Sequence, residues 1–317
     1  YMINPLHEDK LIKAHERIKP FIHRTPILSS SSINQMAGSE IMFKCENFQK
    51  IGAFKMRGAA NAISQLINSK SIKGITTHSS GNHAQAVALA SKNAGFNTKI
   101  VMPNNSPKVK IEAVKGYGAE IVFCEPTLVA REEAVDRIIH ADGFTFIHPY
   151  DNWEVIYGQA SCAKEIYEDQ NKEFDFILAP IGGGGLMAGT ILSTMIYSPS
   201  TKIIGCEPKG ADDAYLSWKA GKYIPQTNPQ TIADGLKTSV GKINYPIIMD
   251  NVTEILTVTD EEIITSMQLI YERLKIVIEP SCAVPLAVIL KNKHMFQGKR
   301  LAVILTGGNV DLENLPF

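Results

Sequence analysis

The sequence predicts an α/β protein with two open parallel-sheet domains, and two observations lead to this prediction. Short apolar runs alternate with stretches of helical period in two series along the chain, which is the βαβ rhythm of parallel sheets covered by helices. A chain of 317 residues, 44% hydrophobic and 20% charged, can bury a large core and is expected to form two lobes. We therefore expect a smaller domain, residues 74–151, inserted into a larger one made of residues 1–73 and 152–317.

The first series of elements lies in the smaller domain. Its strands are expected at 74–79, 99–103, 120–125 and 144–149, and its helices at 81–95, 107–118 and 128–142. The second series has expected strands at 174–181, 202–208, 254–259 and 301–308, and helices at 186–197 and 261–275. Ligands of open parallel sheets bind beyond the carboxyl ends of the strands. Ser79, Ser80, Gly182–Gly185, Glu207 and Thr306 fall at such ends.

Charge and cysteine content exclude several classes of partner. Thirty-two basic residues balance thirty-two acidic ones, so no overall field favours nucleic acid or an anionic membrane. The five cysteines have no CxxC spacing, which is typical of reduced, buried thiols. The first eighteen residues are polar and helix-like, and no apolar run is long enough to span a membrane. We expect a cytoplasmic protein that binds a small ligand.

Lys55 lies between an aromatic residue and a run of small residues in the segment IGAFKMRGAA. A lysine in such a place can form a Schiff base with an aldehyde. As a single feature it is also compatible with a surface lysine whose stem covers an apolar patch. Other segments therefore have to support a catalytic role.

Gly182–Gly185 lie between an expected strand and an expected helix. Free N–H groups at the start of that helix favour a phosphate, and glycine allows the backbone to approach it closely. Gly183, Gly185 and Ala188 also match a relaxed dinucleotide pattern, with Glu207 placed for a ribose. A nicotinamide-dependent dehydrogenase and a purely structural turn stay open at this point.

Four motifs in fixed order carry a resemblance to a known family: GAFKMRGA around Lys55, SSGNH at 79–83, the tetraglycine, and TGGN at 306–309. With them the sequence resembles the fold type II pyridoxal phosphate enzymes, which have the tryptophan synthase β-like architecture. The likeness spans essentially the whole chain and is greatest to serine racemases and serine/threonine ammonia-lyases. It implies pyridoxal 5'-phosphate as cofactor and a homodimer.

The resemblance also implies roles for individual residues. Lys55 would be the Schiff-base lysine, Phe54 would pack near the ring, and Gly182–Gly185 would hold the phosphate. Asn82 would contact the ring hydroxyl, and Thr306 would offer the pyridine nitrogen a hydroxyl instead of a carboxylate, which weakens the ring as an electron sink. The side chains expected to bind the substrate carboxylate are those of Ser79, Ser80, Asn82 and His83.

Ser80 is expected to be the second catalytic residue. The resemblance implies that it faces the substrate from the side opposite Lys55, once the smaller domain closes, and can donate or accept a proton there. The expected activity is ammonia-lyase action on L-serine, L-threonine or threo-3-hydroxyaspartate, giving a 2-oxo acid and ammonia. Serine racemisation with side elimination is the nearest alternative, and a non-catalytic cofactor-binding protein is a remote one.

A metal site is implied by resemblance to the divalent cation site of serine racemases. Its ligands would be the carboxylates of Glu207 and Asp213 and the carbonyl of Ala211. Hard oxygen ligands of this kind suit Mg²⁺, Ca²⁺ or Mn²⁺. The same residues are also compatible with a solvated acidic turn.

Overall fold

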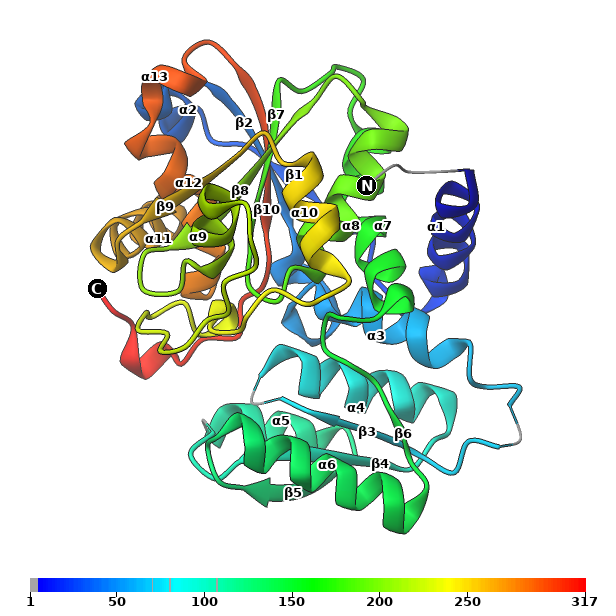
Figure 1. Ribbon diagram of the computed structural model, residues 1–317. Helices are drawn as coiled ribbons and strands as arrows, with labels where there is room; N and C mark the ends of the chain where they lie inside the picture. Colours follow the sequence, from blue (N-terminus) through cyan, green and yellow to red (C-terminus); the bar gives the residue numbers. More distant parts are fainter. Residues whose placement is uncertain (1–4, 70, 80, 107) are drawn as a thin grey trace.

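The computed structural model describes residues 5–69, 71–79, 81–106 and 108–317, and it contains two separate sheets (Figure 1). The larger sheet has the strand order β1-β2-β10-β7-β8-β9, and the smaller has the order β5-β4-β3-β6. All pairings are parallel except that of β1 with β2. The two open parallel-sheet units of the sequence prediction are confirmed.

The strands of the larger sheet are β1 (Ile27–Leu28), β2 (Glu40–Cys45), β7 (Phe176–Pro180), β8 (Lys202–Pro208), β9 (Glu254–Val258) and β10 (Arg300–Leu305). The strands of the smaller sheet are β3 (Ile75–His78), β4 (Thr98–Pro103), β5 (Glu120–Cys124) and β6 (Thr145–Phe146). Strands β1 and β2 were not among the expected elements.

The helices before residue 170 are α1 (Pro5–Ile18), α2 (Ser31–Ala37), α3 (Lys55–Ser64), α4 (Asn82–Ala94), α5 (Lys108–Gly116), α6 (Leu128–Asp142) and α7 (Trp153–Asp169). Those after it are α8 (Gly185–Tyr197), α9 (Asp213–Ala220), α10 (Asn244–Asn251), α11 (Asp260–Leu274), α12 (Pro280–Lys291) and α13 (Lys293–Phe296). Among the described residues, no helix has the length and apolar character needed to cross a membrane.

Local sequence explains where several helices begin and end. Asn152 caps α7 through its side chain, and Thr259 with Glu262 forms a capping box at α11. Helices α4 and α6 end at Gly95 and Gly143, both in the left-handed conformation that glycine adopts without strain. These capping residues determine where the helices that connect the strands begin and end.

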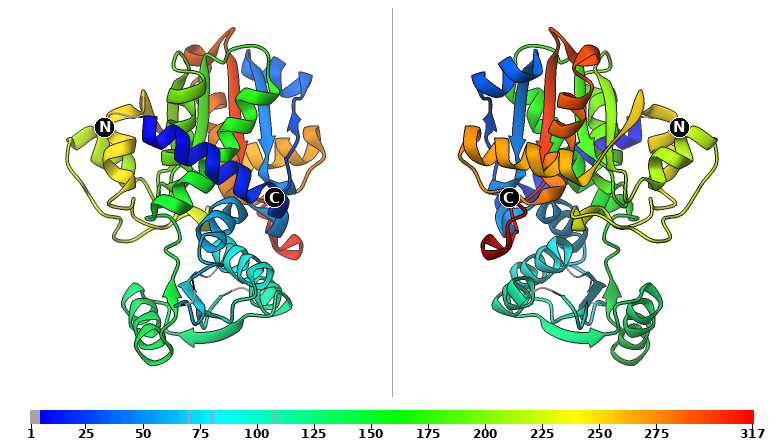
Figure 2. Two further views of the ribbon diagram at one scale, coloured as in Figure 1. Left: turned by 90° about the vertical axis from the view of Figure 1, so that its right-hand side faces the viewer. Right: turned by 90° about the vertical axis from the view of Figure 1, so that its left-hand side faces the viewer.

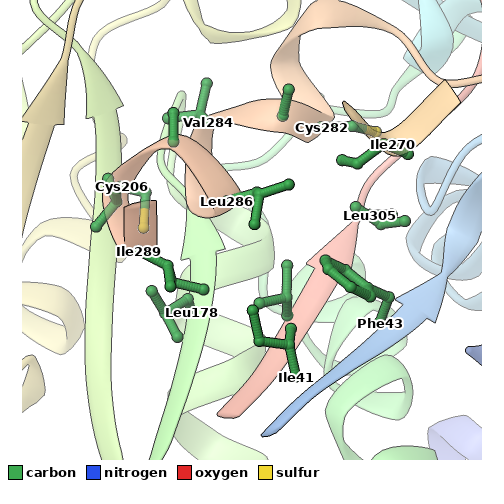
Figure 3. Packing of buried hydrophobic residues seen from close by; sticks show 14 of the residues in the cluster. Ile41, Phe43, Leu178, Cys206, Ile270, Cys282, Val284, Leu286, Ile289 and Leu305 are labelled. Atoms are coloured by element: carbon green, nitrogen blue, oxygen red, sulfur yellow. The ribbon is translucent and has the colours of Figure 1, made fainter. Parts of the chain in front are cut away.

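Helices cover both faces of the larger sheet (Figure 2). On one face α2, α11 and α12 bury a cluster that includes Phe43, Leu178 and Leu305 from three strands (Figure 3). On the other face α1, α7, α8 and α10 bury Ile177 and Ile304. This enclosure explains why the central strands read as continuous apolar runs.

Helix α3 connects the two sheets. Its apolar residues, among them Met56 and Ile63, share a core cluster with α4 and with β3 and β4 of the smaller sheet. Its other side packs against α7 of the larger unit, where Gly158 allows the backbones of the two helices to approach closely. Lys55, at the first position of α3, therefore lies between the two units.

Candidate active site

A cavity of about 180 Å³ lies where carboxyl ends of strands from both sheets meet. His78 at the end of β3, Pro180 at the end of β7 and Thr306 after β10 contribute to its wall. Helices α3, α4, α8 and α12 begin at or beside the same wall. The electropositive ends of four helices thus converge on one space, which favours an anionic ligand.

Most of the residues predicted from sequence line this cavity. They are Phe54, Lys55, Ser79, Asn82, His83, Gly182, Gly183, Gly184, Gly185 and Thr306. Ser80 lies outside the described residues. The cavity is also lined by polar residues that the sequence analysis did not single out: Lys110, Arg131, Asp234, Thr238, Glu279 and Ser281.

Lys55 presents its amine to the cavity from the first turn of α3. Its Nζ donates to the Pro149 carbonyl at 2.8 Å and lies 5.3 Å from the centre of the Phe54 ring. Loss of solvent around the amine lowers the pKa of Lys55 to about 8, although the nearby charge of Glu279 acts in the opposite direction. A usable fraction of the amine is therefore neutral, and nucleophilic, near neutral pH.

The glycine run forms a cradle at the start of α8. Gly184 precedes the helix with φ +89° and provides no side chain to cap the N–H groups of the first turn. A Cβ at Gly183 would lie 2.2 Å from the Tyr150 ring, and one at Gly184 would lie 2.7 Å from Ile248. Only glycine fits here, and the uncapped helix start can receive a phosphate.

Helix α4 opens toward the same cavity, with Gly81 as its N-cap residue, and no described side chain caps it. Ser79 accepts a hydrogen bond from the Gly81 N–H at 3.2 Å. His83 is buried and contacts the Ile147 carbonyl through Nε2 at 3.2 Å, and burial lowers its pKa well below the ordinary value. The neutral imidazole thus anchors α4, and the free N–H groups of this helix face the cavity.

The side chain of Asn82 belongs to a polar network. Its Nδ2 donates to Glu279 Oε1 at 2.8 Å, and Asn309 donates to its Oδ1 at 2.9 Å. Burial, and then the charge of Asp234, raises the pKa of Glu279 to about 7. Among the described residues Glu279 Oε2 has no hydrogen-bond partner, so this buried carboxyl can bind one further donor from the cavity.

Lys110 joins the two units at the edge of the cavity. Its Nζ donates to Asp234 Oδ2 at 2.5 Å, which links α5 to the short 3-10 helix η4 (Asp234–Leu236). Burial opposes the charged form, but Asp234 and Glu279 raise the pKa of Lys110. Sequence offered no signal for this pair, because its members lie 124 positions apart.

Thr306 is tied to the loop that carries the lysine. Its carbonyl accepts from the Phe54 N–H at 3.0 Å, and Ala53 forms an isolated bridge with Gly307. The end of β10 and the start of α3 are therefore held together directly, with Lys55 and the Thr306 hydroxyl on the same cavity wall.

The residues of the expected metal site lie away from the cavity, at the end of β8 and the start of α9. Glu207 accepts from the N–H groups of Ala214 and Tyr215, and Asp213 Oδ2 accepts from Val240. Asp213 Oδ1 is enclosed and has no hydrogen-bond partner in the described part of the chain. Burial raises the pKa of both carboxyls, that of Asp213 to about 6. The described residues contain no cluster of three or more His, Cys, Asp or Glu that could hold a metal.

Comparison with known proteins agrees with this geometry. Residues 18–307 match the family model described as pyridoxal-phosphate dependent enzyme. The chain is 48% identical to the beta-hydroxyaspartate dehydratase of Paracoccus denitrificans (strain Pd 1222), with 100% of both chains covered. It is 46% identical to the serine racemase of Dictyostelium discoideum, over 96% of this chain and 94% of that one.

The crystal structure of the serine racemase from Dictyostelium discoideum has a TM-score of 0.90 to this fold, with 45% identity and coverage of 96% of this chain and 98% of that one. The family match favours the lysine chemistry over the dinucleotide interpretation of the glycine run. The chain belongs to the family of pyridoxal-phosphate dependent enzymes.

Proposed function

We propose that this enzyme is an ammonia-lyase whose preferred substrate is a β-hydroxy amino acid with a second carboxylate, of the threo-3-hydroxyaspartate class. Serine and threonine would be poorer substrates. Loss of the β-hydroxyl as water, followed by addition of water at Cα, converts the substrate to a 2-oxo acid and ammonium. The likeness to a beta-hydroxyaspartate dehydratase supports this choice.

The observation that carries the substrate proposal is Arg131, on α6. Its side chain lines the cavity, and its Nε is enclosed and has no hydrogen-bond partner among the residues that the structure describes. Burial lowers the pKa of the neighbouring His78 to about 4, so that histidine is neutral and adds no charge beside Arg131. A guanidinium with an unused donor is suited to a carboxylate, whereas the side chains of serine and threonine offer it no negative charge.

The cavity fits the cofactor of the family. Lys55 supplies a partly neutral amine, and the uncapped start of α8 with its glycine cradle is suited to a phosphate. When bound, pyridoxal phosphate supplies an electron sink that stabilises negative charge at the substrate Cα. We propose that Gly182–Gly185 hold its phosphate, Phe54 and Asn82 contact the ring, and the Thr306 hydroxyl meets the ring nitrogen.

Residues of the cavity would bind the substrate and move its Cα proton. The N–H groups at the start of α4, with Ser79, Asn82 and His83, bind and orient the substrate carboxylate. The neutral Lys55 amine removes the Cα proton at its Nζ. The proposed role of Ser80, proton transfer on the opposite face, stays a prediction because that residue lies outside the described ranges.

A comparison of substrates across two arginine variants tests the proposal. L-serine, D-serine, L-threonine and the hydroxyaspartates are incubated with the enzyme, and 2-oxo acid and enantiomers are measured together. Loss of one charge-assisted contact in Arg131→Gln should lower kcat/KM for hydroxyaspartate about 10- to 100-fold, with little change for serine. Arg137→Gln, on the exposed side of the same helix, is the matched control. Equal losses for serine and hydroxyaspartate in Arg131→Gln would refute the assignment.

Serine racemisation is the second candidate, supported by the 46% identity to a serine racemase. It predicts exchange between L-serine and D-serine that exceeds the release of pyruvate. Lys55→Ala should abolish both activities, because both need a base at Cα. Retained turnover in that variant would exclude the mechanism for either candidate.

We also propose that Glu207, Asp213 and the Ala211 carbonyl bind a divalent cation such as Mg²⁺, Ca²⁺ or Mn²⁺. The support is the unpartnered Asp213 Oδ1 beside a second buried carboxyl, a pair that a cation would stabilise. A chelator should lower the melting temperature, and added metal should restore it. In Glu207→Gln both responses should disappear. An unchanged melting temperature in the wild-type protein would remove the proposal.

Three further expectations stay predictions: a homodimer, a cytoplasmic location and domain boundaries at residues 74 and 151. Residues of α3 share a core with the smaller sheet, although α3 precedes the expected boundary at residue 74. Limited proteolysis would show where the chain is cut between the two domains.

A further inference from the structure

A buried thiol lies directly behind the cavity wall at Thr306. Cys282, in the first turn of α12, is 0% exposed and belongs to the core cluster on this face of the larger sheet (Figure 3). Its Sγ is 3.3 Å from the Thr306 hydroxyl oxygen, 2.9 Å from the Gly307 nitrogen and 2.7 Å from the Gly307 oxygen. Thr306 itself is 3% exposed and lines the cavity.

The hydrogen atoms around this sulfur can be accounted for. Burial, and then the charge of Glu279, raises the pKa of the Cys282 thiol, which therefore keeps its proton. The S–H donates to the Gly307 carbonyl, and the Gly307 N–H donates to the sulfur. With the thiol proton used in this way, the Thr306 hydroxyl proton has two possible acceptors: the sulfur, or a group in the cavity.

Sulfur is a weak acceptor of hydrogen bonds. The contact with Cys282 is therefore strong enough to hold the Thr306 side chain in place but too weak to retain its proton against a good acceptor. An aromatic nitrogen without a proton is such an acceptor. A serine at position 282 would be a stronger acceptor and would compete for the same proton.

We propose that Cys282 is a positioning residue, which orients the Thr306 hydroxyl and leaves its proton available to an aromatic nitrogen in the cavity. The proposal rests on the proposed function, because it takes Thr306 to be the partner of the cofactor ring. It goes beyond that function by assigning a task to a residue that does not touch the cofactor. The chemical class of the acceptor is an unprotonated pyridine.

A purely structural role for Cys282 makes a different prediction. If the thiol only fills space, serine should replace it almost without effect and alanine should be the worse variant, since alanine leaves a small void. If the weak acceptor matters, serine should be worse than alanine for cofactor affinity, while alanine stays worse for stability. The two rankings are opposite, and they can be measured on the same set of proteins.

The experiment uses the full chain freed of cofactor, with Cys282→Ser and Cys282→Ala. Cys45→Ser and Cys45→Ala are the controls, because Cys45 is equally buried and donates to a backbone carbonyl, that of Phe43, at 3.3 Å. Each protein is titrated with pyridoxal phosphate, followed by absorbance, and is melted without cofactor. We expect Cys282→Ser to bind about 3- to 10-fold more weakly than wild type, Cys282→Ala to lose less affinity, and the controls to bind like wild type.

A double-mutant cycle isolates the hydroxyl. In a Thr306→Val background the proton in question is gone, so Cys282→Ser should no longer change the affinity. A persistent loss in that background, or wild-type affinity in Cys282→Ser, overturns the proposal. Failure of the wild-type protein to bind pyridoxal phosphate would instead reject the proposed function on which it rests.

Infrared spectroscopy of the wild-type protein tests the same point without any variant. The S–H stretching band of Cys282 should keep the frequency of a thiol that donates to a carbonyl when pyridoxal phosphate is added, because its proton stays on the Gly307 carbonyl. A move of this band to the frequency of a thiol that donates no hydrogen bond would mean that the proton leaves the Gly307 carbonyl, and it would overturn the proposal.

Discussion

Replacement of Arg57 by methionine should destabilise this protein more than replacement of any exposed arginine. Arg57 is 0% exposed in α3, two residues after Lys55, and its guanidinium donates to both Glu46 and Glu165 at 2.7 to 2.9 Å. Lys44 also donates to Glu165, at 2.7 Å. Two buried cations thus balance two buried carboxylates, and Arg57→Met leaves one negative charge uncompensated.

The magnitude follows from this imbalance. Removal of one partner from a buried ion pair typically costs about 3 to 5 kcal/mol, because the remaining charge stays buried. For a chain of 317 residues, the usual unfolding entropy per residue converts each kcal/mol to roughly 1.5 °C in melting temperature. The expected loss in Arg57→Met is therefore roughly 5 to 8 °C.

Thermal melting of the cofactor-free protein provides the assay, with Arg24→Met as control. Arg24 makes ion pairs with Glu168 and Asp169, but its side chain is 46% exposed, so its loss should cost at most about 1 kcal/mol. High salt should leave the loss in Arg57→Met nearly unchanged, since buried pairs are screened weakly. Equal melting temperatures for the two variants would refute the reasoning.

Three further changes test the cavity itself. Gly183→Ala places a Cβ 2.2 Å from the Tyr150 ring, so the affinity for the cofactor should fall by about tenfold or more. An unchanged affinity in an absorbance titration would contradict the proposal that this glycine run holds the phosphate. Because burial lowers the pKa of Lys55 to about 8, the rate of cofactor capture should rise with pH around a midpoint near 8, and a midpoint above 10 would contradict an enclosed amine. Asp234→Asn breaks the pair with Lys110, whose side chain is only 9% exposed, so hydrogen exchange in residues 108–116 should become faster. Unchanged exchange there would mean that the pair does not hold α5.

The sequence was sufficient to predict those cavity residues that lie in a recognisable local pattern. Lys55 begins a helix, Gly182–Gly185 connect a strand to a helix, and Thr306 ends an apolar run, so each has a signal within its own ten residues. The structure brings all of them to one cavity. Strand β2 was missed, although five of its six residues are partly or fully buried. Its apolar run is interrupted by Lys44, which is buried only because it pairs with the distant Glu165.

Pairs that are distant in the sequence could not be predicted in this way. Arg57 meets Glu165 across 108 positions, and Lys110 meets Asp234 across 124. Neither residue type nor spacing announces such a contact, because it depends on how α3 and α5 pack against the rest of the protein. Arg131 was missed for a related reason: within α6 it reads as one charge among several, and only the fold turns it toward the cavity.

The contrast between Lys55 and Arg57 shows how the fold assigns chemistry to one of two neighbouring cations. Both occupy the first turn of α3, and burial disfavours the charge of both. Arg57 forms ion pairs with the carboxylates of Glu46 and Glu165, which raise its pKa well above the ordinary value despite burial. The Lys55 amine donates to a backbone carbonyl, and the nearest compensating charge is that of Glu279, which forms no ion pair with it. Burial therefore lowers the pKa of Lys55 to about 8. A buried cation paired with carboxylates keeps its proton and holds the helix in place. A buried cation without such a pair can lose its proton. The difference in charge compensation therefore leaves Lys55, and not Arg57, as the cation that can lose its proton near neutral pH.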